Sequence, residues 1–379
     1  MTYRIAIAGA GIGGLAAASL LAQGGHDITL FERFTTPRPL GSGLVVQPVG
    51  LAVLERIGAG DSARKLGAPI RRMLGHTERR RILDASYPKG RPGLAMHRAA
   101  LFHCLWTRAQ AAGITTQTGL TATGTYETAT GIHLLTDQGD HGPFDLIIDA
   151  SGAGSALSPL KARPLPFGAV WAQVPWPMTD LPTDQLCQRY HRASRMAGIL
   201  PIGFLPDDPA PRAAVFWSLS NAELDAWPDQ TLAGWKAETA RFWPAMAPFL
   251  DQITDKAQLT PARYSHGALR QPYRARLVHI GDAAHRTSPQ LGQGANMALL
   301  DALSLALALR QPLDQALPAH ARARRWHLGL YQAVSAMFTP QYQSHSRVLP
   351  VLRDHILAPL TRLPPFPGLI ARLVAGELL

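Results

Sequence analysis

Residues 3–32 read YRIAIAGAGIGGLAAASLLAQGGHDITLFE. The apolar run at residues 3–8 is typical of a buried parallel strand. A glycine-rich turn follows, and the Ala- and Leu-rich residues 15–23 predict a helix that stops at the next two glycines. Residues 27–32 predict a second strand, which ends in an acid. The stretch therefore predicts a βαβ unit and, around it, an α/β fold.

The turn between the first strand and the helix has the spacing Gly-x-Gly-x-x-Gly. Gly9 allows the tight turn, Gly11 lets the backbone approach a pyrophosphate, and Gly14 lets the helix pack against the strand. A helix N-terminus also stabilises the charge of a phosphate. The predicted phosphate site comprises Gly9, Gly11, Ile12, Gly13 and Gly14.

The second predicted strand ends at Glu32, 21 residues after Gly11, and Arg33 follows. This is close to the spacing of the acid that hydrogen-bonds the adenosine ribose of a dinucleotide. The loop, helix and terminal acid together predict dinucleotide binding. A purely structural turn is the alternative, and the acid does not distinguish NAD from FAD.

Composition restricts the class of protein. The chain has 379 residues, 46% of them hydrophobic and 17% charged, and its formal net charge is +11. Its mean hydropathy is close to zero, which excludes a disordered chain and a multispan membrane protein. The excess of bases is compatible with nucleic acid, an anionic membrane surface or acidic ligands. Because the bases are scattered and no nucleic-acid signature is present, a basic enzyme that does not bind nucleic acid is favoured.

Two alternatives concern location. Residues 5–26 lack Asp, Glu, Lys and Arg and so resemble a signal peptide or a membrane span. Their glycine cluster lies where a strand would turn into a helix, so we expect no integral membrane segment. Two cysteines, Cys104 and Cys187, provide neither a disulfide framework nor a zinc site. We therefore predict no metal and a cytoplasmic protein.

Other segments have recognisable periodicity. Helices are expected at residues 48–57, 97–112, 232–243 and 294–309. Strands are expected at residues 71–81 (as a pair), 145–150 and 275–280, and a β-meander at residues 115–142 with turns at Gly124, Gly131 and Gly139.

A second motif follows the strand near residue 280, where residues 277–285 read LVHIGDAAH. The strand end places the Asp282 carboxylate at the carboxyl edge of the sheet, where it can accept hydrogen bonds from a polyol. A Gly-rich loop then opens a helix, whose N-terminus suits a developing negative charge. The loop residues in question are Pro289, Gly292, Gly294, Ala295 and Asn296. A structural cap or core acid is the alternative for Asp282.

The two motifs in this order resemble the single-component (group A) flavin monooxygenases with the p-hydroxybenzoate hydroxylase fold. The resemblance covers about residues 1–335. It implies a Rossmann-like FAD-binding domain interleaved with a β-sheet substrate domain, followed by a C-terminal helical tail. The implied boundaries are 1–70, 95–165 and 265–335 for the FAD-binding domain, 71–94 and 166–264 for the substrate domain, and 336–379 for the tail.

The resemblance also implies roles for residues. The first glycines and Glu32 would hold the ADP part of FAD, and Asp282 its ribityl chain. Arg98, at the start of a predicted helix, would contact the phosphate and ribityl region, while residues 41–48, which include Gly43, match a stretch before the second helix of these enzymes. The loop after Asp282 would lie beside the flavin ring, so Pro289, Gly292 and His285 are flavin-proximal candidates. No catalytic residue is identified, and a structural hydrogen bond is the favoured interpretation of His285.

One position departs from the pattern. These enzymes usually have Asp-Gly after the central strand, with an acid that supports both the cofactor and NAD(P)H. Here the run is Asp149-Ala150-Ser151-Gly152, so that Ser151 occupies the place of the acid. A hydroxyl can still hydrogen-bond but carries no charge, which leaves open how the flavin is reduced.

The implied reaction is insertion of one oxygen atom from O₂ into a small aromatic or enolic substrate, through a flavin C4a-hydroperoxide, with NAD(P)H as reductant. Two rivals remain: a reductase or oxidase of the same fold, and a non-catalytic, membrane-peripheral flavoprotein. The second is prompted by a tail in which apolar residues alternate with arginines. The favoured interpretation is that the tail caps the substrate pocket or packs against a second subunit, as in a homodimer.

Candidate substrate contacts come from the region between the two motifs. Tyr190 and His191 belong to a basic and aromatic run that could orient an anionic or phenolic substrate, and Trp217 is a further candidate. The favoured interpretations, however, are an edge strand with solvated bases for the run and a core position for Trp217.

Overall fold

The N-terminal sequence folds as a βαβ unit at the centre of a six-stranded sheet. The computed structural model describes residues 1–36 and 42–378, so Gly41, the first residue of the stretch 41–48, lies outside the described residues. The strands are, in sheet order, β18 (Tyr273–Arg274), β19 (Leu277–His279), β12 (Leu146–Asp149), β1 (Arg4–Ala8), β2 (Asp27–Glu32) and β8 (Thr115–Thr118). All pairs are parallel except β18 with β19.

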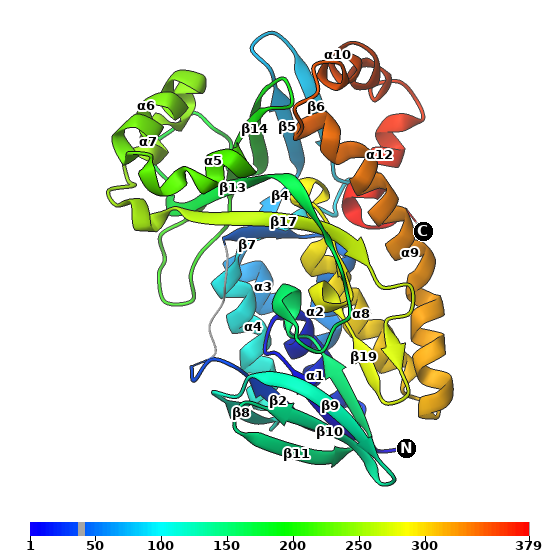
Figure 1. Ribbon diagram of the computed structural model, residues 1–379. Coiled ribbons are helices and arrows are strands. Elements are labelled where there is room, and N and C mark those ends of the chain that lie inside the picture. The colour runs from blue at the N-terminus through cyan, green and yellow to red at the C-terminus, as the bar shows by residue number, and fades with distance from the viewer. Residues whose placement is uncertain (37–41, 379) are drawn as a thin grey trace.

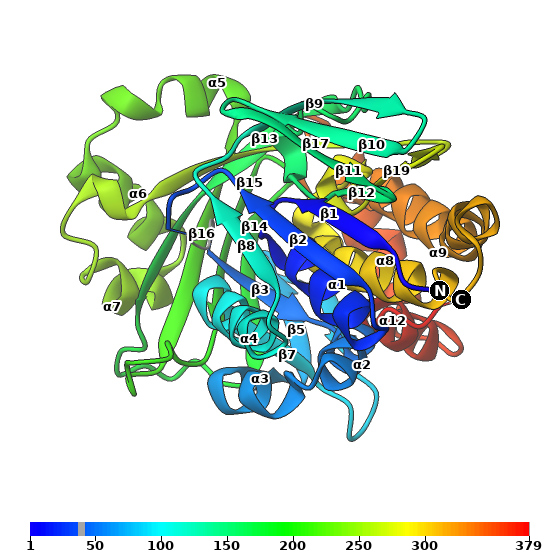
Figure 2. The ribbon, with the colours of Figure 1, turned by 90° about the horizontal axis from the view of Figure 1, so that it is seen from below.

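Strand alternation gives this sheet two different buried faces. Ile5 and Ile7 pack into the main core with the helices, whereas Ala6 and Phe31 pack against a second, three-stranded sheet. Figure 2 shows α1, α4 and α8 on one side and β9, β10 and β11 on the other. The helices are α1 (Ile12–Gln23), α2 (Pro48–Ile57), α3 (Gly60–Leu66), α4 (Arg98–Ala111) and α8 (Gly294–Ala308), and the small sheet is β9 (Ala122–Thr128), β10 (Gly131–Thr136) and β11 (Gly139–Phe144). The predicted α/β fold is confirmed.

A second, eight-stranded sheet lies above the first sheet in the view of Figure 1. Its strands are, in order, β20 (His285–Arg286), β17 (Thr260–Ala268), β13 (Arg163–Pro175), β16 (Arg212–Ser220), β15 (Arg195–Pro201), β14 (Gln185–His191), β5 (Arg72–His76) and β6 (Arg81–Ser86). The helices α5 (Asn221–Asp225), α6 (Leu232–Phe242) and α7 (Ala247–Leu250) lie at one end of the molecule, and the last two cover one face of this sheet. A three-stranded sheet of β3 (Gly43–Val46), β7 (Gly93–His97) and β4 (Ala68–Ile70) joins the other face to the helices around α8.

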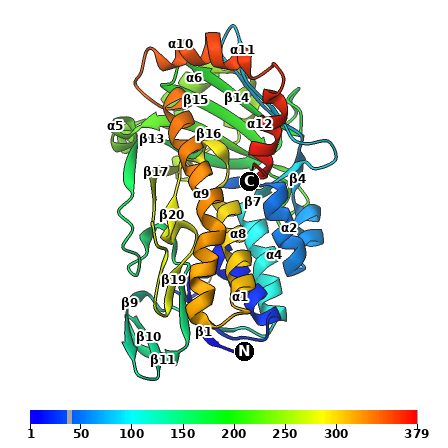
Figure 3. The ribbon, with the colours of Figure 1, turned by 90° about the vertical axis from the view of Figure 1, so that its right-hand side faces the viewer.

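The C-terminal part is helical. The helix α9 (Leu313–Tyr342) runs along one side of the molecule, and α10 (Leu349–Leu352), α11 (Ala358–Leu360) and α12 (Phe366–Ala375) follow it (Figure 3). Residue 336, where the sequence suggested that the tail begins, falls within α9. Among the residues described, no helix combines the length and the apolarity that a membrane crossing requires.

The meander expected at residues 115–142 was wrong in two respects. Residues 115–118 form β8, which joins the main sheet beside β2, and Gly124 lies inside β9 rather than in a turn. The chain turns at Gly119, where φ is +74°. Period-2 alternation identified strands here but could not determine which sheet each strand joins.

We predict different effects on stability at two glycines of the first turn. A Cβ atom at Gly14 would collide with the carbonyl oxygen of Gly9, whereas at Gly11 it would have no atom within 4 Å. Gly14→Ala should therefore lower the free energy of unfolding of the apoprotein by about 1–3 kcal/mol. Gly11→Ala, the matched control, should lower it by less than about 1 kcal/mol. Urea titration would measure both, and equal effects would contradict the packing role of Gly14.

Candidate active site

The first glycine loop leaves open space above the N-terminus of α1. Gly9 has φ +105°, and a Cβ atom there would lie 2.6 Å from the carbonyl oxygen of Ala150. Gly11 precedes the first turn of α1, and a Cβ atom at Gly11 would have no neighbour within 4 Å. The loop is thus packed against β12 on one side and open on the other, so a pyrophosphate could approach the backbone N–H groups of the helix start.

Glu32 closes this loop from the adjacent strand. Its carboxylate is buried and accepts hydrogen bonds from the backbone N–H groups of Ala10 (2.8 Å) and Phe34 (3.0 Å). These bonds fix the loop geometry and leave further lone pairs on the carboxylate for a ribose hydroxyl. Arg33 is exposed, and its guanidinium lies 4.7 Å from the centre of the Phe34 ring.

The start of α1 and the turn that carries Asp282 meet at one small residue of α8. A Cβ atom at Gly13 would lie 3.3 Å from Cβ of Ala298, and one at Gly281 would lie 3.2 Å from the same atom. The turn that carries Asp282 therefore sits next to the start of α1. Asp282 itself is exposed, at the open side of this junction.

Arg98 and Asp282 lie close to each other across this open side. Arg98 is the first residue of α4, a position where the helix dipole disfavours a cation. Burial lowers the pKa of the Arg98 guanidinium, and the negative charge of Asp282 opposes that shift. At this open side, the Arg98 guanidinium could bind a phosphate and the Asp282 carboxylate could accept hydrogen bonds from hydroxyl groups of the same ligand.

The second loop begins with a capped turn and ends at a helix N-terminus. Ser288 caps the turn that starts at Pro289, and Gly292 has φ +61°, a conformation that favours glycine. No atom lies within 4 Å of a Cβ atom built at Gly294, so the N-terminus of α8 is open, and Ala295 lies in its first turn.

Asn296 holds this loop in place. Its amide oxygen accepts from the Gln47 N–H (2.8 Å), and its amide nitrogen donates to the carbonyl oxygens of Val45 (3.1 Å) and Gly292 (3.1 Å). The side chain is fully buried. We therefore expect Asn296 to join β3 to the loop rather than to reach a cofactor through its amide.

Three amide atoms beside the loop are buried without a hydrogen-bond partner among the described residues: Gln47 Nε2, Gln290 Nε2 and Gln293 Oε1. Such groups are costly unless a ligand or water completes them. Two donors and one acceptor suit the carbonyl and N–H groups along the pyrimidine edge of a flavin ring. All three lie in stretches that the resemblance matched, residues 41–48 and 289–296, but the sequence assigned no role to their side-chain amides.

Asp301 connects the turn that carries Asp282 with β20 and α9. Its carboxylate accepts from the Gly281 N–H (3.0 Å), from His285 Nε2 (2.6 Å) and from Arg324 Nε (2.7 Å). Burial alone would raise the pKa of Asp301, but the charges and hydrogen bonds of His285 and Arg324 hold it well below its usual range. His285 is therefore engaged in a structural hydrogen bond, in agreement with the interpretation favoured from the sequence.

The network continues to the C-terminus of the chain. Arg324 donates to His327 Nδ1 (3.1 Å), and His327 Nε2 donates to the carbonyl oxygen of Gly376 (2.9 Å). Tyr331 donates to the carbonyl of Leu373 (2.9 Å), and Gln293 to that of Val374 (3.2 Å). The helix α12 is thus bound to the loop that starts α8.

The position of Ser151 has an unexpected environment. The Ser151 hydroxyl donates to Asp149 Oδ1 (2.5 Å), and the Ser155 hydroxyl and His279 Nδ1 donate to Oδ2 (2.6 and 2.7 Å). Burial would raise the pKa of Asp149, but these donors lower it. The hydroxyl therefore points toward a buried carboxylate two residues earlier in the chain.

The predicted substrate contacts do not come together. Trp217 lies in the core between the large sheet and α6 and α7, on the opposite face from its neighbours Ala214 and Phe216. Tyr190 is buried beside Tyr342, and its pKa is raised well above its usual value by burial and by that second phenol. His191 is exposed at the end of β14.

An apolar face without these residues lies next to the second loop. Its members are Val45, Ile70, Tyr87, Ala95, Leu200, Ile202 and Ala214, with Val374 of α12 packed against them. Tyr87 donates to Gln47 Oε1 (2.6 Å), which connects this face with the unpartnered amides. A Cβ atom built at Gly292 would lie 3.5 Å from Gln47 Nε2, so this buried apolar cluster adjoins the second loop.

Among the described residues, no group of three or more His, Cys, Asp and Glu side chains could hold a metal ion.

We predict a pH-dependent loss of stability at His320. Burial lowers the pKa of His320 to about 4, compared with about 6.5 in an unfolded chain. Protonation thus favours the unfolded state, so this contribution is complete above about pH 6.5 and is lost as the pH falls toward 4. Between pH 7 and 4.5 the loss should be about 2–3 kcal/mol.

Thermal or urea unfolding at both pH values would measure this loss. His320→Gln should have a shallower dependence on pH than the wild type, whereas His103→Gln, at an exposed position, should keep the wild-type slope. A His320→Gln variant with the full wild-type slope would contradict the assignment.

Comparison with known proteins identifies the family. Residues 2–323 match the "FAD binding domain" family. The chain is 27% identical to a 2-heptyl-3-hydroxy-4(1H)-quinolone synthase of Mycobacteroides abscessus, over 94% of each chain. It is also 27% identical to an FAD-dependent urate hydroxylase of Klebsiella pneumoniae, over 81% of this chain and 82% of that protein.

Solved structures agree on the fold. Klebsiella pneumoniae HpxO complexed with FAD and uric acid superposes with a TM-score of 0.81 at 23% identity, covering 99% of this chain and 97% of that one. A point mutant of a 2-methyl-3-hydroxypyridine-5-carboxylic acid oxygenase superposes with a TM-score of 0.81 at 22% identity, covering 98% and 97%. The match from residue 2 to residue 323 includes both glycine loops, and it confirms the predicted FAD cofactor: the chain belongs to the FAD binding domain family.

Proposed function

We propose that this FAD-dependent monooxygenase inserts one oxygen atom of O₂ into a small, electron-rich aromatic ring, with NAD(P)H as the reductant. Nitrogen heteroaromatic rings are the favoured class, because the relatives described above are named for quinolone, urate and pyridine chemistry. The observation that carries the proposal is the convergence of both glycine loops with an apolar sheet face at one place.

The residues present fit an FAD molecule. The first loop and Glu32 would hold the ADP part, Arg98 and Asp282 the phosphate and ribityl region, and residues 289–296 the flavin ring. The open Cβ positions at Gly11 and Gly294 and the unpartnered amide of Gln47 are the features that a bound cofactor would fill. When bound, FAD supplies the activation of oxygen that amino-acid side chains lack.

The protein's own contribution is orientation, charge stabilisation and exclusion of water. The N-terminus of α8 would stabilise negative charge on the adjacent ring edge. The face that includes Tyr87 and Val374 would hold the substrate ring and keep water out. No described side chain is assigned as a general base, since His285 is engaged with Asp301.

Reduction by NAD(P)H is expected to be slow in the absence of substrate. Ser151 replaces the usual acid, and its hydroxyl is directed toward Asp149. This feature favours a reductase or oxidase as the second candidate function. A homodimer and a cytoplasmic location are also part of the proposal, and both described cysteines are free, as a reducing compartment would require.

We predict that Asp282→Ala weakens FAD binding by about ten- to a hundredfold. A charge-assisted hydrogen bond contributes roughly 1.5–3 kcal/mol, and Asp282 lies at the open rim beside Arg98. Fluorescence titration of the apoprotein with FAD would measure the effect. Asp180→Ala, at an exposed loop position, should keep the wild-type affinity, and an unchanged affinity in Asp282→Ala would refute the role of Asp282.

We further predict that the oxygen in the product comes from O₂. The reduced enzyme would be reoxidised under ¹⁸O₂ in the presence of urate, a hydroxypyridine carboxylate or a 4(1H)-quinolone, and mass spectrometry would detect label in the products. Incorporation of label into one of these rings supports the monooxygenase. Stoichiometric hydrogen peroxide with no labelled product from any of them would favour the oxidase or reductase instead.

A further inference from the structure

The tail after α9 exposes apolar side chains instead of burying them. Along α10, the π-helical turn Arg353–Leu357 and α11, six large apolar residues are 39–73% exposed: Val348, Val351, Leu352, Ile356, Leu360 and Leu363. Phe366 and Leu369 of α12 are 42% and 43% exposed. The inner side, in contrast, holds a fully buried arginine, Arg353. This is the reverse of the usual pattern of a surface helix.

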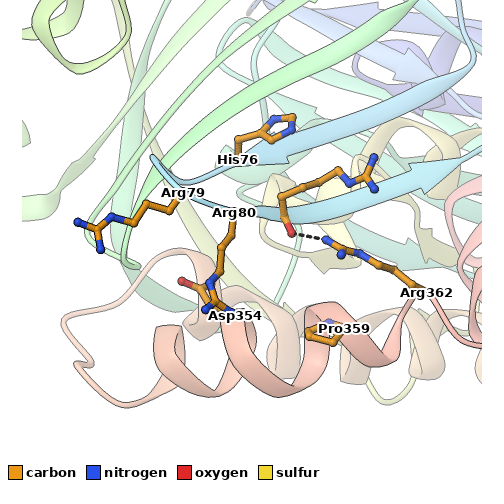
Figure 4. A pocket seen from close by; sticks show the side chains of 7 residues that line it. His76, Arg79, Arg80, Asp354, Pro359 and Arg362 are labelled. Atoms are coloured by element: carbon orange, nitrogen blue, oxygen red, sulfur yellow. Dashed lines mark hydrogen bonds between the residues drawn. The ribbon is translucent and has the colours of Figure 1, made fainter.

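A basic pocket of about 460 Å³ lies directly beside these residues. It lies between the turn that joins β5 to β6 and the tail, and it is open to solvent (Figure 4). Its lining residues are His76, Arg79, Arg80, Arg81, Asp354, Pro359 and Arg362. Arg362 donates to the carbonyl oxygen of Arg81 (2.8 Å), which ties the tail to the turn.

The charges in this pocket are only partly balanced. Arg81 pairs with Asp84 (3.1 Å), and Asp354 accepts from Arg353 (2.7 Å). Within residues 1–36 and 42–378, neither Arg79 nor Arg80 has a carboxylate oxygen within 4.0 Å. The pocket therefore has an excess of positive charge, from arginines that are exposed to solvent.

We propose that this end of the molecule docks on an anionic phospholipid surface. A lipid phosphate would occupy the arginine pocket, and the exposed apolar side chains would enter the boundary between head groups and acyl chains. Interfacial helices bind in this way when an apolar face is bordered by basic residues, and an anionic leaflet attracts such bases. Figure 1 shows β5 and β6 next to α10, and Figure 3 shows α10 and α11 at the same end of the molecule, so the arginines and the exposed apolar side chains could contact one lipid surface.

A second copy of the chain fits the same surface less well. A two-fold contact places each patch against itself, so it would bring Arg79, Arg80 and Arg362 of both copies into one interface. A lipid surface supplies negative charge and an apolar layer together. The proposal concerns the catalytically competent enzyme and does not depend on its substrate.

Co-sedimentation of the FAD-loaded, full-length protein with vesicles tests the proposal. Vesicles of phosphatidylcholine with about 30% phosphatidylglycerol should bind the protein, vesicles of phosphatidylcholine alone should bind it far less, and salt should weaken the binding. Arg79→Gln/Arg80→Gln should reduce the partition coefficient about thirtyfold at low salt, since each arginine contributes roughly fivefold. Arg322→Gln/Arg325→Gln removes the same charge from exposed positions on α9 and should have little effect.

The apolar part is tested separately. Ile356→Ser should lower vesicle binding several-fold at high salt, whereas Met178→Ser, at a 96% exposed position in another loop, should not. Equal loss in the two arginine variants would indicate a non-specific charge effect and overturn the proposal.

Three other results would also overturn it. One is the absence of binding to the anionic vesicles. Another is a dimer in analytical ultracentrifugation that Ile356→Ser dissociates, since a second copy would then cover the face. The third is stabilisation by inorganic phosphate, lost in Arg79→Gln/Arg80→Gln, without any vesicle binding, which would identify a site for small anions only.

Discussion

The buried carboxylate of Asp301 is the interaction on which the geometry of the candidate site depends. It connects the turn at Gly281, the strand residue His285 and the helix α9 through Arg324. Breaking a buried ion pair from one side leaves the other charge uncompensated, which typically costs about 3–5 kcal/mol. The turn that carries Asp282 and the strand β20 are therefore held to α9 by one charged group rather than by local turn propensity.

This network also explains why the end of the chain belongs to the site. Arg324 also donates to His327, and His327 donates to the carbonyl oxygen of Gly376. Detachment of α12 would therefore leave buried donors without an acceptor. Val374 is then positioned against the apolar sheet face. The same α12 begins among the exposed apolar residues of the tail, so one short helix joins the proposed lipid-facing end to the substrate region.

Local chemistry accounts for what the sequence predicted well. The βαβ unit and the Asp282 turn depend on residues that are close together in the chain. In the βαβ unit, the carbonyl oxygen of Gly9 lies so close to Gly14 that a side chain at Gly14 would collide with it. Trp217 lies in the core, as the favoured interpretation had it, and the sequence could not place the substrate face because that depends on how the whole sheet packs. No role was predicted for the Gln47 side-chain amide, because its surroundings form only when β3 meets the loop before α8. The Gln47 backbone N–H bonds there to Asn296, 249 residues later in the chain, and Gln47 Nε2 is left buried without a partner.

The substitution at Ser151 shows how a local comparison can mislead. Taken alone, it removes a negative charge from the rim of the site. In the structure a carboxylate is present two residues earlier, but Asp149 is fully buried and satisfied by His279 and two hydroxyl groups. The hydrogen bonds to Asp149 hold the 151–155 turn against Gly9, and the buried carboxylate presents no charge to a ligand. The electrostatics of the rim therefore depend on Asp282 and Arg98, the exposed acid and the helix-start cation across the same opening.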